Sequence, residues 1–68
     1  MFYIYVLRSS IDNNLYTGYT NDLKQRIEDH NKGKVASTRN RTPLEIIYSE
    51  GYKSEKDARK REKNLKLR

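Results

Sequence analysis

The chain has 68 residues, of which 34% are hydrophobic, and it contains no cysteine and no tryptophan. A chain of this length forms at most one small domain with a thin core, because it buries only ~60% of its unfolded surface. The missing cysteines exclude disulfides and thiolate metal sites, and the apolar stretch 1–7 is too short for a signal peptide or a membrane span. We therefore expect a cytoplasmic protein that does not enter a membrane.

The formal net charge is +6, and it is unevenly distributed along the chain. Residues 1–34 contain five Lys or Arg and four Asp or Glu, whereas residues 35–68 contain ten and five. This one-sided basic character predicts a polyanionic partner. Nucleic acid is favoured over a membrane because the basic second half has few large apolar residues. The simpler interpretation is a charged surface that keeps the protein soluble.

The first predicted elements are two aromatic-rich segments, 3–8 and 15–19, separated by turn-forming residues at 9–14. Crowded aromatic and β-branched residues on both sides of such a turn predict a β-hairpin with a loop longer than two residues.

Successive side chains of a strand point to opposite faces, so Tyr3, Tyr5 and Leu7 share one face of this hairpin. Pairing of Tyr5 with either Tyr16 or Gly18 places the hydroxyls of Tyr5 and Tyr16 on the same face. Gly18 has no side chain, so it leaves room for a group to approach the backbone.

A helix is predicted next, with Thr20 or Asn21 as its N-cap and Asp22 in its first turn. Gly33 is suited to the left-handed conformation that ends a helix. Arg26 borders the apolar face of this helix and lies one turn before His30, so both side chains can point toward the same place. The face itself consists of residues spaced i, i+4 and i+7, namely Leu23, Ile27 and His30.

Residues 34–42 are polar and basic and show no hydrophobic periodicity, so we expect a mobile loop there. Pro43 then precedes a predicted strand at 44–48, which Glu50-Gly51 closes. Three residues of this strand are expected to share a face, namely Leu44, Ile46 and Tyr48.

The last segment begins at 54–57 with a sequence that resembles a capping box and predicts a second helix. Glu62 lies between Ala58 and Leu65 on the only apolar face of this helix. A carboxylate directed at the body of a protein is costly unless it is paired or bound to a metal. The helix reaches the end of the chain without a stop signal, as in a truncated longer protein. The segment is otherwise basic, through Lys53, Lys56, Arg59, Lys60, Arg61, Lys63, Lys66 and Arg68.

Two tripeptides in the hairpin carry a family resemblance. Tyr3-Ile4-Tyr5 followed by Tyr16-Thr17-Gly18 resembles the paired signature of the GIY-YIG nucleases, and most closely their short stand-alone bacterial members. Nearly the whole chain is covered, because three further positions of the family follow in order, namely Arg26, His30 and Glu62. The chain departs from the family pattern at Tyr3 and Thr17, and at Tyr19, where several members have a lysine.

This resemblance implies a catalytic role for each of five residues. Glu62 would hold one divalent cation, Mg²⁺ or Mn²⁺, because such a cation can bind one carboxylate together with waters and substrate phosphate. Arg26 would clamp the scissile phosphate. Tyr5, supported by Tyr16, would help to deprotonate the attacking water, and His30 would relay a proton.

A purely structural interpretation competes with each of these roles. Tyr5 would be core filling, Arg26 a surface cation and His30 a buried structural residue. Glu62 would form a salt bridge, for which the sequence offers the partners Arg26, Arg59, Arg61 and Lys66.

Together these patterns predict one α+β domain at 1–68, a small three-stranded antiparallel sheet flanked by helices in the order strand, strand, helix, strand, helix. The five implied site residues should converge on one shallow pocket. We expect a metal-dependent DNA endonuclease that acts as a monomer in repair or recombination. The first alternative is a non-catalytic or weakly active nucleic-acid-binding module of the same fold, and the second is a small structural or partner-binding protein whose basic helix binds an acidic protein. Nucleic acid would contact Lys34, Arg39, Arg41, Arg59, Lys60 and Lys63.

Overall fold

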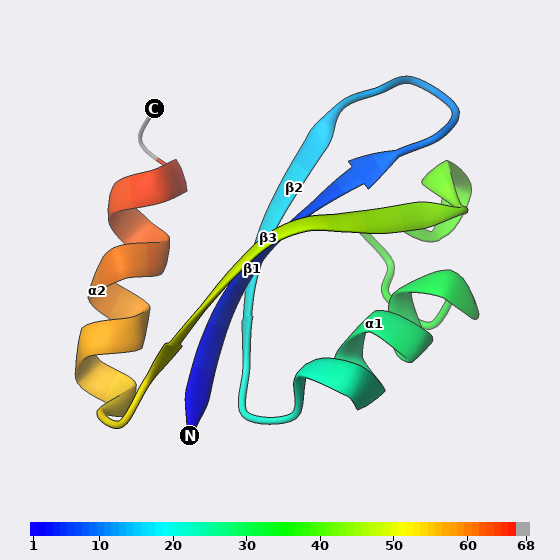
Figure 1. The fold of residues 1–68 in the computed structure, drawn as a ribbon. Helices are drawn as coiled ribbons and strands as arrows, with labels where there is room; N and C mark the ends of the chain where they lie inside the picture. The colour runs from blue at the N-terminus through cyan, green and yellow to red at the C-terminus, as the bar shows by residue number, and fades with distance from the viewer. Residues whose placement is uncertain (67–68) are drawn as a thin grey trace.

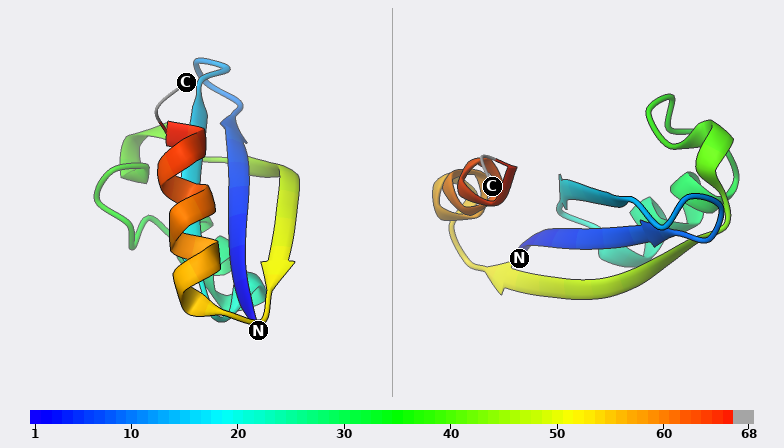
Figure 2. Two further views of the ribbon diagram at one scale, coloured as in Figure 1. Left: turned by 90° about the vertical axis from the view of Figure 1, so that its left-hand side faces the viewer. Right: turned by 90° about the horizontal axis from the view of Figure 1, so that it is seen from above.

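The computed structural model describes residues 1–66, so Arg68 of the basic C-terminal segment lies outside the described range. Its strands form one antiparallel sheet in the order β2-β1-β3, and its two α-helices flank that sheet (Figure 1). Figure 2 (left) shows α2 along one face of the sheet and α1 behind the other. The predicted architecture and element order are confirmed. The elements are β1 (Phe2–Ser9), β2 (Leu15–Thr20), α1 (Leu23–Asn31), the 3₁₀ helix η1 (Arg39–Arg41), β3 (Leu44–Tyr52) and α2 (Glu55–Lys66).

The hairpin of β1 and β2 adopts one of the two predicted registers, with Tyr5 opposite Gly18. Its loop is closed by backbone hydrogen bonds from Ser9 N to Asn14 O (3.0 Å) and from Asn13 N to Ser9 O (2.9 Å). Asn13 has a φ of 62°, in the left-handed region that asparagine tolerates better than most residues. The turn chemistry of the sequence thus fixes the register, and the register fixes which side chains share a face.

A β-bulge interrupts the pairing of β1 with β3. Leu7 lies opposite Ile46, whereas Val6 lies opposite Tyr48, so Ile47 has no partner in β1. Neighbouring residues of β1 point to opposite faces, and the extra residue therefore places Ile46 on the face of Leu7 and Tyr48 on the face of Val6.

This bulge makes the prediction for the third strand wrong in one respect, since Tyr48 does not share a face with Leu44 and Ile46. The strand also continues to Tyr52, beyond the end predicted at Glu50-Gly51. The even-numbered residues of β3 therefore face α1 before the bulge and α2 after it.

The face toward α1 contains the hydrophobic core. Buried Tyr5, Leu7 and Leu44 pack against half-buried Tyr16 of β2 and against the apolar face of α1. The side chain of Asn31 fixes the end of α1 to the start of β3, because it accepts from Leu44 N (2.8 Å) and donates to Leu44 O (3.1 Å).

The two ends of α1 differ in how well the sequence predicted them. The N-cap is Asp22, whose carboxylate accepts from Gln25 N at 3.2 Å, so the prediction of Thr20 or Asn21 is wrong. Thr20 instead exchanges hydrogen bonds with the backbone of Asp22. At the other end, Gly33 has a φ of 77° and terminates the helix as predicted.

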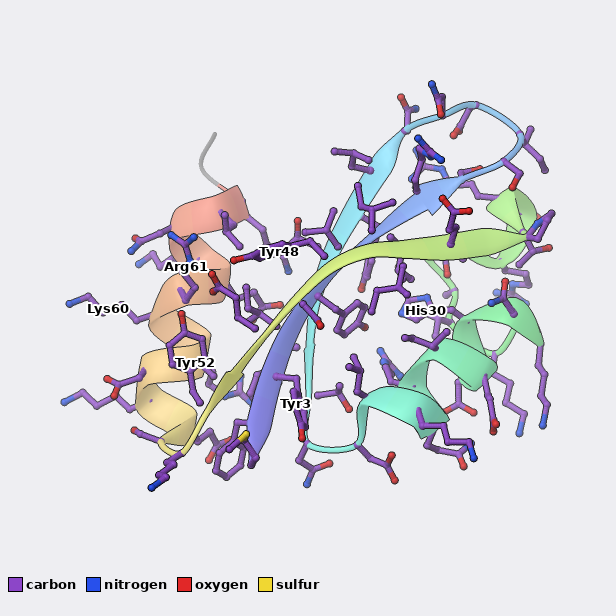
Figure 3. All side chains as sticks on the ribbon, viewed as in Figure 1. Tyr3, His30, Tyr48, Tyr52, Lys60 and Arg61 are labelled. Atoms are coloured by element: carbon purple, nitrogen blue, oxygen red, sulfur yellow. The ribbon has the colours of Figure 1, made fainter. Side chains whose placement is uncertain are left out.

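The other face of the sheet carries fully buried Ile4 of β1, and Ala58 is the one buried residue of α2. Polar contacts add to the attachment of this helix. The Ser54 hydroxyl accepts from Asp57 N (3.3 Å), as the capping pattern predicted. The carboxylate of Glu50 accepts hydrogen bonds from Tyr48, from Tyr52 (2.8 Å) and from Arg61 Nε (3.0 Å). Figure 3 shows Tyr48, Tyr52 and Arg61 meeting in the space between β3 and α2. We call these four residues the Glu50 clamp.

The Glu50 clamp makes the stability of the domain dependent on pH. Hydrogen bonds from Arg61 and then Tyr48 lower the pKa of Glu50 from 4.5 to about 2. A carboxylate with a depressed pKa stabilises the fold above its unfolded pKa, and this contribution is lost as the pH falls through the folded value. Glu50→Gln should therefore lower the melting temperature at neutral pH, and its difference from the wild type should vanish as the pH falls toward about 2.

The matched control for this change is Glu45→Gln. Glu45 also pairs with an arginine, Arg8, at 2.7 Å, but both side chains are largely exposed. Exposed ion pairs contribute little, so its melting curve should follow the wild type. Equal melting temperatures for Glu50→Gln and Glu45→Gln at neutral pH would show that the clamp does not hold α2.

Candidate active site

The side chain of Tyr5 reaches from the central strand to the edge strand β2. A Cβ atom built on Gly18 would overlap the hydroxyl and the ring of Tyr5, so the phenol lies directly over this glycine. Gly18 was expected to leave room for a group to approach the backbone, and that group is the ring of Tyr5 itself. Any other residue at position 18 would displace the phenol from the sheet edge.

Three residues from different elements meet around this phenol. The hydroxyl of Tyr5 lies 2.9 Å from Nε2 of His30 on α1, and both residues are fully buried. The ring of Tyr16 packs edge-on against His30, with ring centroids 5.1 Å apart, and lies 6.5 Å from the ring of Tyr5. His30 is seen between α1 and the sheet in Figure 3.

Arg26 lies one turn before His30 on α1 and is half-buried. Burial raises the pKa of the Tyr5 phenol, and the neighbouring Arg26 guanidinium opposes that shift. Interaction with the Tyr5 phenol in turn raises the pKa of Arg26. Burial and then the charge of Arg26 lower the pKa of His30, so its imidazole is neutral at pH 7. Arg26, Tyr5 and His30 therefore form one electrostatically coupled group.

Glu62 comes from α2, on the opposite side of the sheet. Its side chain is 18% exposed and forms an ion pair with Lys66 at 3.0 Å, one of the partners that the structural interpretation offered. Lys66 is 51% exposed, so this pair is weak. Burial is the main cause that raises the pKa of Tyr5, and the charge of Glu62 adds a smaller contribution of the same sign. The carboxylate therefore acts on the phenol through space, without a hydrogen bond between them.

The fit of a metal ion rests on this one carboxylate. Within residues 1–66 there is no group of three His, Cys, Asp or Glu side chains that could hold a cation, and no enclosed pocket. Of the five residues expected to converge on one shallow pocket, Tyr5, Tyr16, Arg26 and His30 come together, and Glu62 lies on the other side of the sheet. The shared pocket stays a prediction. A half-buried carboxylate whose one ion-pair partner among residues 1–66 is weakly held can still supply an oxygen ligand to Mg²⁺ or Mn²⁺, which keep several waters and bind substrate phosphate.

Comparison with known proteins identifies the family of this chain. The family model described as the GIY-YIG catalytic domain matches residues 1–68. The chain belongs to the GIY-YIG family. A UPF0213 protein of Streptococcus agalactiae is 49% identical over 61 residues, which are 88% of this chain and 68% of the relative. A UPF0213 protein of Natronomonas pharaonis is 43% identical over 65 residues, or 94% of this chain and 75% of the relative.

A solved structure supports the same assignment. The solution NMR structure of a UPF0213 protein from Bacillus halodurans matches with a TM-score of 0.62 and 34% sequence identity. The match covers 100% of this chain and 73% of that chain. The sequence match therefore shows a GIY-YIG catalytic-type domain, and the solved structure supports its fold.

The basic residues predicted to bind nucleic acid lie in two groups on this GIY-YIG domain. The first group follows α1, at Lys34, Arg39 and Arg41, and Arg41 is paired with Asp12 at 3.4 Å. The second group is on the exposed surface of α2 and consists of Arg59, Lys60 and Lys63. The two groups are at opposite ends of the molecule (Figures 1 and 2), and Figure 3 shows Lys60 pointing away from the sheet.

Two features of this GIY-YIG site were not predicted from the sequence. Thr38 is fully buried and its hydroxyl lies 2.7 Å from Nδ1 of His30, although it belongs to the segment expected to be a loop. That segment also contains buried Val35 and the helix η1. The second feature is the guanidinium of Arg59, which lies 4.4 Å from the ring centroid of Tyr19 and so places a cation where the chain departs from the family lysine.

Proposed function

We propose that this GIY-YIG domain is an endonuclease that hydrolyses phosphodiester bonds of DNA with the help of one divalent cation. The observation that carries the proposal is the coupled group of Tyr5, His30 and Arg26 at the sheet edge, in a chain that matches a catalytic domain over its full length. A guanidinium beside a buried phenol provides a phosphate-binding group next to a group that can exchange a proton.

Each residue has a role in this proposal. Arg26 binds the scissile phosphate and offsets the negative charge that develops on it. Tyr5 exchanges a proton with the attacking water, and the rings of Tyr16 and His30 fix its orientation. Glu62 would hold the cation, which when bound supplies Lewis-acid stabilisation of the phosphate oxygens.

A non-catalytic nucleic-acid-binding module is the second candidate. Two observations favour it, because Tyr5 is fully buried and Glu62 is occupied by Lys66 in the free domain. The two functions differ in what a substrate does to the site. A nuclease must release Glu62 from Lys66 and bring Tyr5 into contact with the reacting water when DNA binds, whereas a binding module need not.

A cleavage assay separates the two candidates. Labelled linear, nicked, flapped and branched DNAs, with single-stranded RNA for comparison, are incubated with the protein in Mg²⁺, Mn²⁺ or EDTA. We expect products in the presence of either cation and none in EDTA, with branched or nicked DNA preferred if the protein acts in repair or recombination. Binding of the same DNAs without cleavage in either metal would favour the binding module.

The basic face of α2 should determine how DNA binding depends on salt. Each lost contact between a basic side chain and a phosphate reduces the steepness of the slope of log affinity against log salt concentration by about 0.9. Replacing Arg59, Lys60 and Lys63 by alanine should therefore flatten the slope by up to about 3 units, as measured by fluorescence anisotropy between low and moderate salt. The matched variant replaces Lys34, Arg39 and Arg41, at the opposite end of the molecule. An unchanged slope for the α2 variant would show that DNA does not contact this helix.

A further inference from the structure

A buried hydrogen-bond chain links the candidate site to the segment between α1 and β3. Tyr5 Oη lies 2.9 Å from Nε2 of His30, and Nδ1 of His30 lies 2.7 Å from Oγ1 of Thr38. All three residues are fully buried. Within the described part of the chain, the hydroxyl of Thr38 has no other hydrogen-bond partner.

This chain contains one proton more than its two hydrogen bonds can use. Each hydroxyl carries one O–H, and the neutral imidazole carries one N–H, so three donors compete for two bonds. If Nδ1 of His30 is protonated, the O–H of Thr38 is left without an acceptor. If Nε2 is protonated, the O–H of Tyr5 is left without one.

The surroundings of the two hydroxyls decide between these arrangements. Thr38 has an aliphatic hydroxyl in the interior, where a donor without an acceptor carries the full cost of its desolvation. The hydroxyl of Tyr5 is also buried in the free domain, but it lies over Gly18 in the edge strand and beside half-buried Arg26 and Tyr16. A substrate phosphate bound by Arg26 would give this O–H an acceptor. A phenol also releases its proton far more readily than an aliphatic alcohol does.

We propose that Thr38 is a positioning residue for Tyr5, because its hydroxyl donates to Nδ1 of His30 and holds the imidazole in the Nε2–H tautomer. His30 then donates to Tyr5 Oη, and the phenol proton is the one free to leave. When substrate binds, that proton can pass to a phosphate oxygen held by Arg26, while Tyr5 Oη, still bonded to Nε2–H, takes a proton from the attacking water. This role deepens the proposed nuclease function and rests on it for its catalytic meaning.

The tautomer can be measured without any substrate, because His30 is the only histidine of the chain. Long-range ¹H–¹⁵N correlation spectra at neutral pH distinguish a protonated ring nitrogen from an unprotonated one. We expect Nε2 to be protonated and Nδ1 to be unprotonated, with Nδ1 shifted upfield by the hydrogen bond from Thr38. A protonated Nδ1 in the wild-type protein would overturn the proposal.

Two variants test the contribution of Thr38 itself. Thr38→Ser keeps the hydroxyl and should keep the Nδ1 shift, whereas Thr38→Val keeps the shape and should move Nδ1 downfield to the position of a free acceptor. In the cleavage assay, Thr38→Val should lower kcat roughly 10–100-fold with little change in KM, the range for a partner that orients a functional histidine, and Thr38→Ser should restore it. An Nδ1 shift in Thr38→Val that equals the wild type would overturn the proposal.

The two proposals fail in different ways. If the wild-type protein cleaves DNA but Nδ1 of His30 is protonated, the nuclease function stands and the role of Thr38 is wrong. If no DNA is cleaved, the spectra still decide which hydroxyl donates to His30, and the wild-type and Thr38→Ser spectra are sufficient should Thr38→Val fail to fold.

Discussion

Glu62→Gln should abolish metal-dependent cleavage and leave the domain folded. The amide keeps the shape of the side chain but removes the charge that would hold the cation. Metal-ion stabilisation of a developing phosphate charge is worth several kcal/mol, so cleavage should fall by at least about 100-fold. The free energy of unfolding should change by less than ~1 kcal/mol, because Lys66, the partner of Glu62, is half exposed and such pairs contribute little.

Lys66→Ala is the matched control for this change, because it removes the same ion pair and keeps the carboxylate. It should cleave at least as well as the wild type, and DNA binding by Glu62→Gln should persist or tighten since a negative charge near the phosphates is gone. Urea unfolding, cleavage rates and an NMR titration with Mg²⁺ provide the measurements. A large loss of stability in Glu62→Gln, with no Mg²⁺-induced shift changes near residue 62 in the wild type, would assign Glu62 a structural role.

Gly18→Ala should damage both stability and activity. A Cβ at position 18 would occupy the space of the Tyr5 hydroxyl and ring, so either the phenol or the edge strand must move. Overpacking of a core usually costs about 1–3 kcal/mol, a large part of the stability of a domain this small. The displaced phenol would also lose its contact with His30, so cleavage should fall together with stability. Urea unfolding and the His30 ring nitrogen shifts report the two effects separately.

Gly51→Ala provides the comparison, since Gly51 is also a strand glycine that pairs with a tyrosine of β1, Tyr3. A Cβ there would lie 2.8 Å from Sδ of Met1, an exposed and flexible side chain that can move aside, and 3.3 Å from Cε1 of half-buried Tyr3, whose ring must shift by a few tenths of an ångström. Alanine also reduces the conformational entropy of the unfolded chain, which favours folding. The variant should therefore be close to the wild type in stability. If Gly18→Ala were equally well tolerated, the close contact between Gly18 and Tyr5 would not be required.

Local chemistry explains why much of this fold could be predicted from the sequence. The hairpin and the end of α1 depend on turn residues and on Gly33, whose conformational preferences act over a few residues. The positions of Tyr5, Arg26 and His30 follow from strand alternation and helix periodicity, so their approach to one another was also predictable. These regularities do not depend on how the elements finally pack.

Features that depend on packing were missed. Nothing in the sequence around Ile47 indicates an extra residue in β3, because a bulge is set by the pairing of two strands. Thr38 stands among basic residues without periodicity, so its burial against His30 could not be read from the pattern. The polar part of the docking of α2 was likewise hidden, since the contact between Glu50 and Arg61 joins residues far apart in the sequence.

The unpaired Ile47 makes the bulge itself, more than the side chain at position 47, the property on which the second half of β3 depends. If β3 paired regularly with Ile47 included, Tyr48, Glu50 and Tyr52 would turn toward α1 and leave α2 without its polar partners. Deleting Ile47 would instead place Tyr48 directly after Ile46, and these side chains would keep facing α2. Substitutions at position 47 would change only one exposed side chain. Over evolutionary time position 47 should therefore accept new amino acids, and even tolerate loss of the residue, as long as Tyr48 stays opposite Val6.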